Sequence, residues 1–344
     1  MFSKIIINKE NLNFNIDYIK EHIQDKKLCI MVKADAYGHG VDMIIPIIES
    51  RVDFFGVSNE QEAFKIRGLT SKGIIVFGAC EDYKKCMRRN ISFAVFSLNN
   101  VKKVVKIAKK YKLTPKMHLC INSGMNRYGV KTEEDVEEII EFLIKENLFL
   151  EGIYTHFSSL TTDEKYTLEQ NNKFQKICSL LPNYWKTIKH IGGGNSIYRN
   201  FDTNMNRVGM LCYGYGNDIV KPVLSIISHI VDIQKVAKGE HIGYLCGYTA
   251  KKDMKVATIP LGYADGLSRK YSNKIYVMIN GQKVYNVGNI CMDAFMVDVS
   301  KLDCKINDEV VVLSDAKEFA PLIESTEYEV LTNFRKFRGK RIFY

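Results

Sequence analysis

Short runs of apolar, often β-branched residues alternate with stretches of helical periodicity through the first two-thirds of the chain. The helical period is clearest over residues 98–111 and 133–146, and Ser58–Asn59 and Ser97 stand where helix N-caps are expected. Parallel strands need crossover helices, so the alternation predicts a (β/α)8 barrel of the TIM type, with an open doubly wound sheet as the alternative. The predicted barrel strands are residues 28–33, 53–58, 73–78, 92–97, 116–121, 151–156, 187–192 and 211–214.

The pattern changes near Pro222, after which short strand-like runs dominate. Asn280–Gly281 joins two of these runs and is a strong hairpin signal. We therefore expect a mostly β C-terminal domain over residues 220–344, a barrel over 10–219, and an N-terminal strand within 1–9 that joins the β domain. The strand-like runs are residues 223–236, 255–259, 274–279, 283–287, 294–299 and 309–313.

The composition of the chain limits the classes of protein to which it can belong. The chain has 344 residues, of which 46% are hydrophobic, so it can bury a large core. Its nine cysteines are an odd number without a CxxC pair, no apolar run reaches the length of a membrane span, and the start turns polar after three isoleucines. We expect a cytoplasmic protein with reduced thiols and no membrane partner. The net charge of +10 suits an anionic ligand or a lysine-rich surface; no basic tail or aromatic-interleaved basic stripe points to nucleic acid.

Lys33 is the first candidate for chemistry, because function in such a barrel sits at the carboxyl ends of the strands. It follows the apolar run of the first predicted strand and precedes a glycine-rich segment. A lysine with a desolvated stem has a lowered pKa, which suits formation of a Schiff base. Taken alone, a lysine at the end of a strand is more often a surface residue.

Two arginines and a glycine-rich turn are predicted at the same end of the barrel. Arg127 lies in a glycine-flanked loop after the fifth strand, and Arg207 lies just before the eighth. Residues 192–194 are three glycines followed by Asn195 and Ser196, a pattern that lets backbone amides and a hydroxyl approach a phosphate. Together with Lys33, these residues predict a phosphorylated aldehyde cofactor held by the lysine; no single member would justify the claim.

The histidines give weaker signals. His156 ends the sixth predicted strand and is interpreted as a supporting residue, not as an acid or base. His118, His156 and His190 belong to different strands, and the sequence has neither an HExxH nor a CxxC motif. We therefore expect no metal site.

Five segments, in order, resemble the alanine racemase family over nearly the whole chain. The first resembles the cofactor-lysine signature of that family. The segments are VKADAYGHG (32–40), SGMNR (123–127), NS (195–196), LGYADG (261–266) and CMD (291–293).

The resemblance implies a racemase that interconverts L- and D-alanine with pyridoxal 5'-phosphate. It implies Lys33 and Tyr263 as two bases on opposite faces of the substrate, and Arg127 and the backbone of Met292 as the carboxylate site. It also implies a homodimer in which Tyr263 and Met292 come from the other subunit, and a role in supplying D-alanine for cell-wall precursors. The cofactor residues that it implies are Lys33, Tyr37, His156, Asn195, Ser196, Arg207, Gly209 and Met210.

Arg207 is the most informative residue of the cofactor set. It would face the pyridine nitrogen, and a guanidinium has no acceptor atom and stays charged. The ring nitrogen would therefore stay unprotonated, which favours racemisation over transamination and decarboxylation. A fold-related decarboxylase would be expected to place a glutamate here.

The chain departs from the family at three places. Cys120 and Asn122 stand where many members have a carboxylated lysine and an aspartate, so Arg127 must be oriented in another way, by a bound anion or by Asn122. Phe337 stands where a phosphate-contacting tyrosine is expected, and the 192–194 glycines are more open than expected. These departures bear on turnover and substrate preference, so a racemase of serine or another small amino acid and a cofactor-binding protein with little activity stay open. An aldolase that uses Lys33 without a cofactor is a further alternative, but Arg127 and Arg207 with Ser196 fit a cofactor better.

Overall fold

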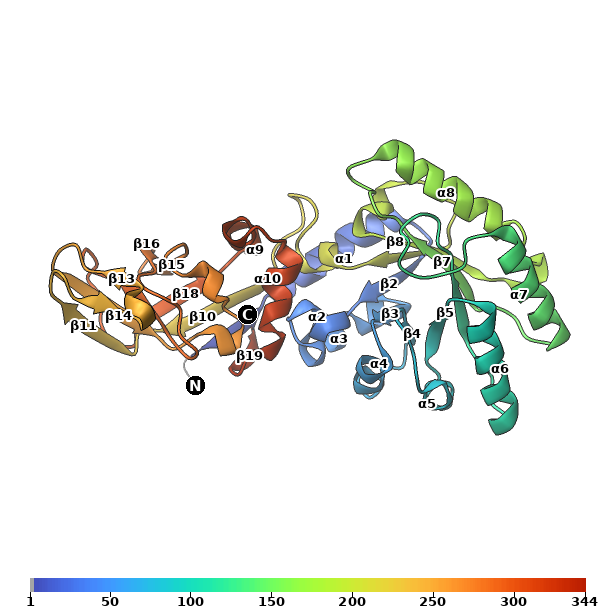
Figure 1. Cartoon of the computed structure of the whole chain (residues 1–344), viewed down its shortest axis with the longest axis horizontal. Coiled ribbons are helices and arrows are strands. Elements are labelled where there is room, and N and C mark those ends of the chain that lie inside the picture. Colours follow the sequence, from blue (N-terminus) through green and yellow to red (C-terminus); the bar gives the residue numbers. More distant parts are fainter. Residues whose placement is uncertain (1–2) are drawn as a thin grey trace.

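The computed structural model describes residues 3–344 and contains a closed barrel of eight parallel strands (Figure 1). The last strand pairs with the first, with Lys27 opposite Met205, which confirms the barrel and excludes the open sheet. Strands β5 and β6 are buried along their whole length, as expected where helices cover a sheet that also faces a filled interior. The barrel strands are β2 (Lys27–Met31), β3 (Phe54–Val57), β4 (Gly73–Val76), β5 (Ser92–Val95), β6 (Met117–Cys120), β7 (Gly152–His156), β8 (Ile188–Gly192) and β9 (Met205–Val208).

Helices cover the barrel on the outside, and α6 shows why the sequence forms them. The Ser97 hydroxyl accepts a hydrogen bond from the amide of Asn100, and Val101, Val104, Val105 and Ala108 form one buried stripe. The helices of this part of the chain are α1 (Lys9–Ile23), α2 (Lys33–Tyr37), α3 (Val41–Ile48), α4 (Glu60–Ile66), α5 (Tyr83–Arg88), α6 (Leu98–Tyr111), α7 (Glu133–Lys145) and α8 (Glu164–Cys178).

The eighth strand was predicted wrongly. Residues 211–214 lie in a 3₁₀ helix (Met210–Tyr213) and the turn after it, while the strand is Met205–Val208. The apolar run is buried because α1 packs on it, where Asn15 donates to the carbonyl of Cys212. A four-residue apolar run has no period that separates a strand from a buried helical turn. Arg207 therefore lies within a barrel strand, not before it, and β2 ends at Met31, two residues before Lys33.

The C-terminal part is mostly β, as predicted, and contains the 280–281 hairpin between β15 and β16. One sheet has the order β16-β15-β18-β10-β1-β19, so the N-terminal strand pairs inside it; a second has the order β11-β14-β17, and β12 pairs with β13. The elements are β1 (Lys4–Ile7), β10 (Leu224–His229), β11 (Asp232–Val236), β12 (His241–Ile242), β13 (Tyr248–Thr249), β14 (Met254–Ile259), β15 (Tyr276–Ile279), β16 (Gln282–Tyr285), β17 (Phe295–Asp298), β18 (Glu309–Leu313), β19 (Lys340–Phe343), α9 (Ala316–Phe319) and α10 (Glu327–Asn333).

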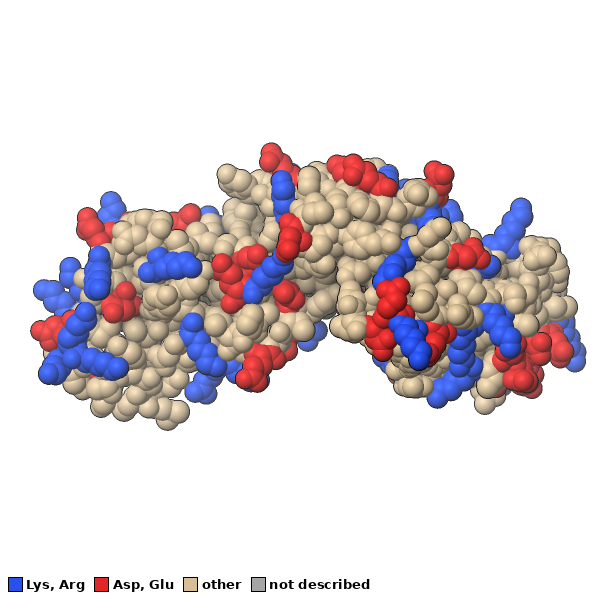
Figure 2. Space-filling model, turned by 90° about the horizontal axis from the view of Figure 1, so that it is seen from above, with Lys and Arg blue, Asp and Glu red and all other residues tan. Residues whose placement is uncertain are grey.

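The two parts meet where α10 packs against α2 and the turn after it (Figure 1). Gly38 follows α2 with a φ of 86°, and a Cβ on it would lie 2.1 Å from the carbonyl oxygen of Leu331 in α10. Charges of both signs are interspersed on the face shown in Figure 2. Within residues 3–344, no helix has both the length and the apolar character that a membrane span requires.

Replacing Gly38 by alanine should destabilise the protein by about 2 kcal/mol or more, because alanine resists this backbone angle and its Cβ would strike a backbone atom. The control is Gly68→Ala, at an exposed glycine where an added methyl group would have no atom within 4 Å and where φ is not positive. Urea unfolding of both variants measures the difference. Equal midpoints would contradict the close contact between α2 and α10.

Candidate active site

Lys33 opens a left-handed turn directly after β2. Ala34, Asp35 and Ala36 have φ of 53–57° and ψ of 46–51°, and Tyr37 has a φ of 52°. Left-handed backbone costs roughly 1–2 kcal/mol for each non-glycine residue, so other contacts must hold this turn.

Charged groups from three segments supply those contacts. The carboxylate of Glu62 accepts from the amide of Ala34 at 2.7 Å. The carboxylate of Asp35 accepts from the amide of Val41 at 3.2 Å and pairs with Lys65 at 3.1 Å and Arg341 at 3.2 Å. Arg341 belongs to β19, so the C-terminal strand fixes the turn that carries Lys33.

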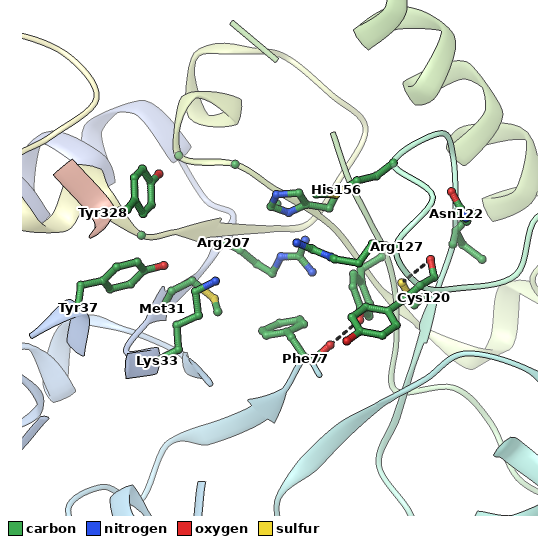
Figure 3. A pocket seen from close by; sticks show the side chains of 18 residues that line it. Met31, Lys33, Tyr37, Phe77, Cys120, Asn122, Arg127, His156, Arg207 and Tyr328 are labelled. Atoms are coloured by element: carbon green, nitrogen blue, oxygen red, sulfur yellow. Dashed lines mark hydrogen bonds between the residues drawn. The ribbon is translucent and has the colours of Figure 1, made fainter. Parts of the chain in front are cut away.

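Lys33, Arg127 and Arg207 line one cavity of about 300 Å³ at the carboxyl ends of the barrel strands (Figure 3). No aspartate or glutamate lines this cavity in the described chain. Two arginines and a lysine without a carboxylate favour an anionic ligand. The other lining residues are Met31, Tyr37, Phe77, Cys120, Ile121, Asn122, Met125, Tyr128, Tyr154, His156, Gly192, Gly193, Gly194, Gly209 and Tyr328.

The surroundings of Lys33 favour its neutral amine. Burial lowers the pKa of Lys33, and the charges of Arg127 and Arg207 lower it further, against a smaller opposite effect of Glu62. A lower pKa raises the fraction of the nucleophilic form at neutral pH.

Arg207 is held rigidly from all sides. Its Nη2 donates to the carbonyl of Thr155 at 2.7 Å, and its Cζ lies 4.6 Å from the ring centroids of both Phe77 and Tyr154. A Cβ at Gly192 would lie 2.1 Å from Nη2, so only glycine leaves room for this guanidinium. Burial lowers the pKa of Arg207, yet an arginine stays charged in proteins, and the aromatic faces help to stabilise that charge.

A column of buried side chains connects Arg207 to the opposite end of the barrel. Arg207 Nη1 contacts His190 Nδ1 at 3.3 Å, His190 Nε2 contacts His118 Nδ1 at 2.8 Å, and His118 Nε2 contacts a Glu151 oxygen at 3.0 Å. Arginine can only donate, so His190 Nδ1 accepts and its proton sits on Nε2; the same logic places the proton of His118 on Nε2. Ser92 also donates to Glu151.

His118 and His190 belong to different strands, β6 and β8, yet they are in contact, because the inward faces of alternate strands meet inside a closed barrel. Both ring nitrogens of His118 and of His190 are hydrogen-bonded within the column. In the described part of the chain, no group of three or more His, Cys, Asp or Glu side chains is arranged to hold a metal ion.

His156 lines the cavity between Arg207 and Arg127 (Figure 3). Burial lowers its pKa to about 3, and the charges of Arg207, Arg127 and Lys33 act in the same direction. The imidazole is therefore neutral at physiological pH, which suits a supporting role beside Arg207.

The other end of the cavity offers hydroxyl groups. Ser196 does not itself line the cavity; it is buried two residues after Gly194, which does, and its Oγ has no hydrogen-bond partner. Tyr37 and Tyr328 line the cavity beside Gly209, and both hydroxyls are directed toward it (Figure 3). Tyr328 comes from α10, so the C-terminal part contributes directly to the pocket.

Three residues that the sequence analysis connects with the cofactor site do not line the cavity: Phe337, Asn195 and Met210. Phe337 does not line the cavity but is buried in the core; the tyrosine that the C-terminal part contributes to the cavity is Tyr328, which precedes Phe337 by nine positions. Asn195 faces a separate surface hollow beside Thr161 and Tyr198. Met210 is buried directly after Gly209 and does not line the cavity.

The loop around Arg127 shows what replaces the family residues. Asn122 Oδ1 accepts from the amides of Gly124 at 3.2 Å and Asn126 at 3.0 Å, so this side chain shapes the loop and does not bind the guanidinium. Cys120 Sγ donates to the carbonyl of Tyr128 at 3.6 Å. Arg127 has no acceptor among the described residues and contacts the Tyr128 ring, with its Cζ 6.0 Å from the ring centroid.

Tyr263 and Met292 lie outside the cavity of their own chain. They are 41% and 52% exposed on the C-terminal part. The amide of Tyr263 donates to the carbonyl of Cys291 and that of Ala264 to the carbonyl of Met292, both at 3.1 Å, so the two segments lie side by side.

Sequence reasoning missed the aromatic walls around Arg207, the histidine column and Tyr328. Phe77 directly follows β4, at the carboxyl end of that strand, a position that could have been used as a signal, whereas Tyr154 lies in the middle of β7. Nothing in the local sequence of Tyr328 indicates that it reaches a barrel pocket.

Nitrogen-15 NMR of the imidazoles tests the column. We expect His118 and His190 to be neutral with the proton on Nε2, with assignments from the His118→Asn and His190→Asn variants. Glu151→Gln retains an acceptor and should preserve this pattern, whereas Glu151→Leu should cost about 1–3 kcal/mol of stability because it leaves a buried donor without a partner. A proton on Nδ1 of His190 would contradict the column.

Comparison with known proteins supports the resemblance. The alanine racemase N-terminal domain model matches residues 7–217, and the C-terminal domain model matches 223–343. Alanine racemase 1 of Clostridium acetobutylicum is 32% identical over an alignment 363 positions long, which covers 98% of this chain and 94% of that protein. The structure of an alanine racemase from Clostridium difficile superimposes with a TM-score of 0.93 at 32% identity and covers 100% of this chain and 96% of its own.

A third structure shares the fold at lower identity. An alanine racemase from Bartonella henselae with covalently bound pyridoxal phosphate has a TM-score of 0.88 at 21% identity, with 100% of both chains covered. Two domain models that together span nearly the whole sequence, and relatives above 30% identity over its full length, place this chain in the alanine racemase family.

Proposed function

We propose that the chain interconverts L- and D-alanine with pyridoxal 5'-phosphate held at Lys33. The observation that carries the proposal is the convergence of Lys33, Arg127 and Arg207 on a cavity without a carboxylate, in a chain of the alanine racemase family. A phosphorylated cofactor and the carboxylate of an amino acid together would supply the negative counter-charge for the arginines, which the cavity itself does not contain.

The residues present fit the cofactor. The unpartnered hydroxyl of Ser196, two residues after the cavity-lining Gly194, would be satisfied if it donated to a phosphate. Tyr37 and Gly209 line the cavity at this end, and Met210 directly follows Gly209. The structural neighbour from Bartonella henselae binds the same cofactor covalently, which supports the assignment.

Arg207 would donate to the ring nitrogen and, having no acceptor atom, keep it unprotonated. The two stacked rings and Thr155 prevent the guanidinium from turning away. His156, neutral at physiological pH, would support Arg207 without competing for a proton. When bound, the cofactor accepts electron density from the substrate and so acidifies its Cα–H bond.

Racemisation requires proton exchange on both faces of Cα, and two residues of this chain supply the bases. The amine of Lys33 acts on one face and the phenol of Tyr263 on the other. Since Tyr263 does not line the cavity of its own chain, it would come from a second copy in a homodimer with shared sites. Met292 beside it would receive the substrate carboxylate through its backbone, opposite Arg127.

The test of the function measures D-alanine formed from L-alanine, followed by a panel of other small amino acids. Lys33→Ala should lose roughly 10³-fold or more in activity, whereas Lys131→Ala, at an exposed lysine, should be unaffected. Borohydride treatment of the holoprotein should attach the cofactor to the peptide that contains Lys33. Attachment elsewhere, or faster turnover of serine than of alanine, would refute the assignment.

Ser196→Ala separates cofactor binding from stability. The apoprotein should be no less stable, because the hydroxyl has no partner there, while the affinity for pyridoxal phosphate should fall roughly tenfold through the loss of one charge-assisted hydrogen bond. The control is Ser228→Ala, whose hydroxyl bonds to Ser3 at 2.9 Å in the C-terminal sheet; it should lose stability and keep cofactor affinity. Unchanged affinity in Ser196→Ala would contradict the phosphate site.

A further inference from the structure

The loops that carry Tyr263 and Met292 are built as one unit. Besides the two backbone hydrogen bonds between them, a Cβ on Gly262 would lie 2.2 Å from the carbonyl oxygen of Met292, so the backbones are in direct contact. The loops are 261–266 and 291–293, and each displays one large exposed hydrophobic side chain, Tyr263 and Met292 respectively.

One guanidinium bridges the two loops. Arg338 Nε donates to Asp265 Oδ1 at 2.8 Å, and its Nη2 donates to Asp265 Oδ2 at 2.9 Å. The same Nη2 lies 2.8 Å from Asp293 Oδ1. A planar guanidinium can hold one carboxylate with two parallel bonds and still reach a second, which a lysine cannot do.

Arg338 with Asp265 and Asp293 forms a clamp between the two loops, and the two ion pairs of this clamp differ in strength. Asp265 is buried and also accepts from the amide of Gly262 at 3.1 Å, so loss of Arg338 would leave a buried carboxylate without its counter-charge. Asp293 is exposed, and a pair with an exposed carboxylate contributes less. The hydrogen bonds that Arg338 donates to Asp265 and then to Asp293 raise the pKa of Arg338, so the guanidinium stays charged at any physiological pH.

We propose that Arg338 is a positioning residue that locks the Tyr263 loop to the Met292 loop. Its effect is to fix where the phenol and the carboxylate-binding backbone of one copy enter the cavity of another. Arg338 does not line the cavity of its own chain. The proposal rests on the proposed function, because Tyr263 acts in a second copy there.

Hydrogen exchange on the apoprotein tests the clamp without any activity measurement. In Arg338→Ala, amides 263–266 and 291–293 should exchange roughly tenfold faster, with Arg338→Lys intermediate, while barrel peptides stay unchanged. The matched control is Arg335→Ala, three residues away, at an exposed arginine with no side-chain partner in the described chain. Sedimentation must show the same oligomeric state for all variants. Equal exchange in Arg338→Ala and Arg335→Ala would overturn the clamp.

Kinetics of the holoenzyme test the consequence. We expect kcat of Arg338→Ala to fall roughly 10- to 100-fold with unchanged affinity for pyridoxal phosphate, since a small misplacement of a reacting group costs about that much. Asp265→Asn should resemble it, whereas Asp293→Asn should mainly raise KM, because it loosens only the Met292 side. A loss of cofactor affinity in Arg338→Ala would overturn the positioning role in favour of a general structural one.

Hybrid dimers decide whether the effect crosses the interface. In a mixture of Arg338→Ala and Lys33→Ala chains, one site of each hybrid combines an intact Lys33 with an intact clamp from the other copy. Activity should recover to about a quarter of the wild-type value, as expected for random pairing of two chains in a symmetric dimer. If the mixture recovers no activity, the clamp of one copy does not act on the active site of the other copy. If the wild-type chain is inactive, the proposed function is refuted, and so is the effect of the clamp on the active site of the other copy. Hydrogen exchange would still show whether Arg338 holds the two loops together.

Discussion

The left-handed turn after Lys33 is the constraint on which the rest of the site depends. Four consecutive non-glycine residues hold positive φ, and this backbone aims the lysine into the cavity. The contacts that hold it come from α4, from Arg341 in β19 and from the close approach of α10 at Gly38. The position of a barrel lysine is therefore determined by the C-terminal part as well, which ties the two parts into one catalytic unit.

Electrostatics explains why the interior beneath the cavity is polar. Buried Arg207 has no carboxylate in contact, and its charge is stabilised by two aromatic faces, one carbonyl and the column that ends at Glu151. The hydrogen bonds in the column run in one direction only, so Glu151 acts as a distant counter-charge while the cavity keeps its positive character. Burial alone would raise the pKa of Glu151, but His118, Ser92 and Lys116 together lower it.

Local rules predicted much of the fold and less of the site. The bounds of α6 follow from its N-cap and its apolar period, and both signals lie within the helix. Strand β9 was missed because it carries two polar residues in succession, Asn206 and Arg207, which are both buried, so that strand reads as a polar loop. The contact between His118 and His190 exists only after the barrel closes, and Tyr328 arrives from another part of the chain. Such features depend on closure and on docking, which no local pattern encodes.

The sheet that holds both ends of the chain has a consequence for synthesis. Lys4 of β1 pairs with Ile227 on one side and with Lys340 on the other, so the first strand made waits for partners that are made much later. During that time Ile5 and Ile7, which are fully buried in the finished protein, have no native place to pack. The ribosome must release almost the entire chain before this sheet is complete, at a rate of about 5–20 residues per second. The segment that forms β1 is thus exposed and able to pair as a strand for roughly tens of seconds before its partners are available.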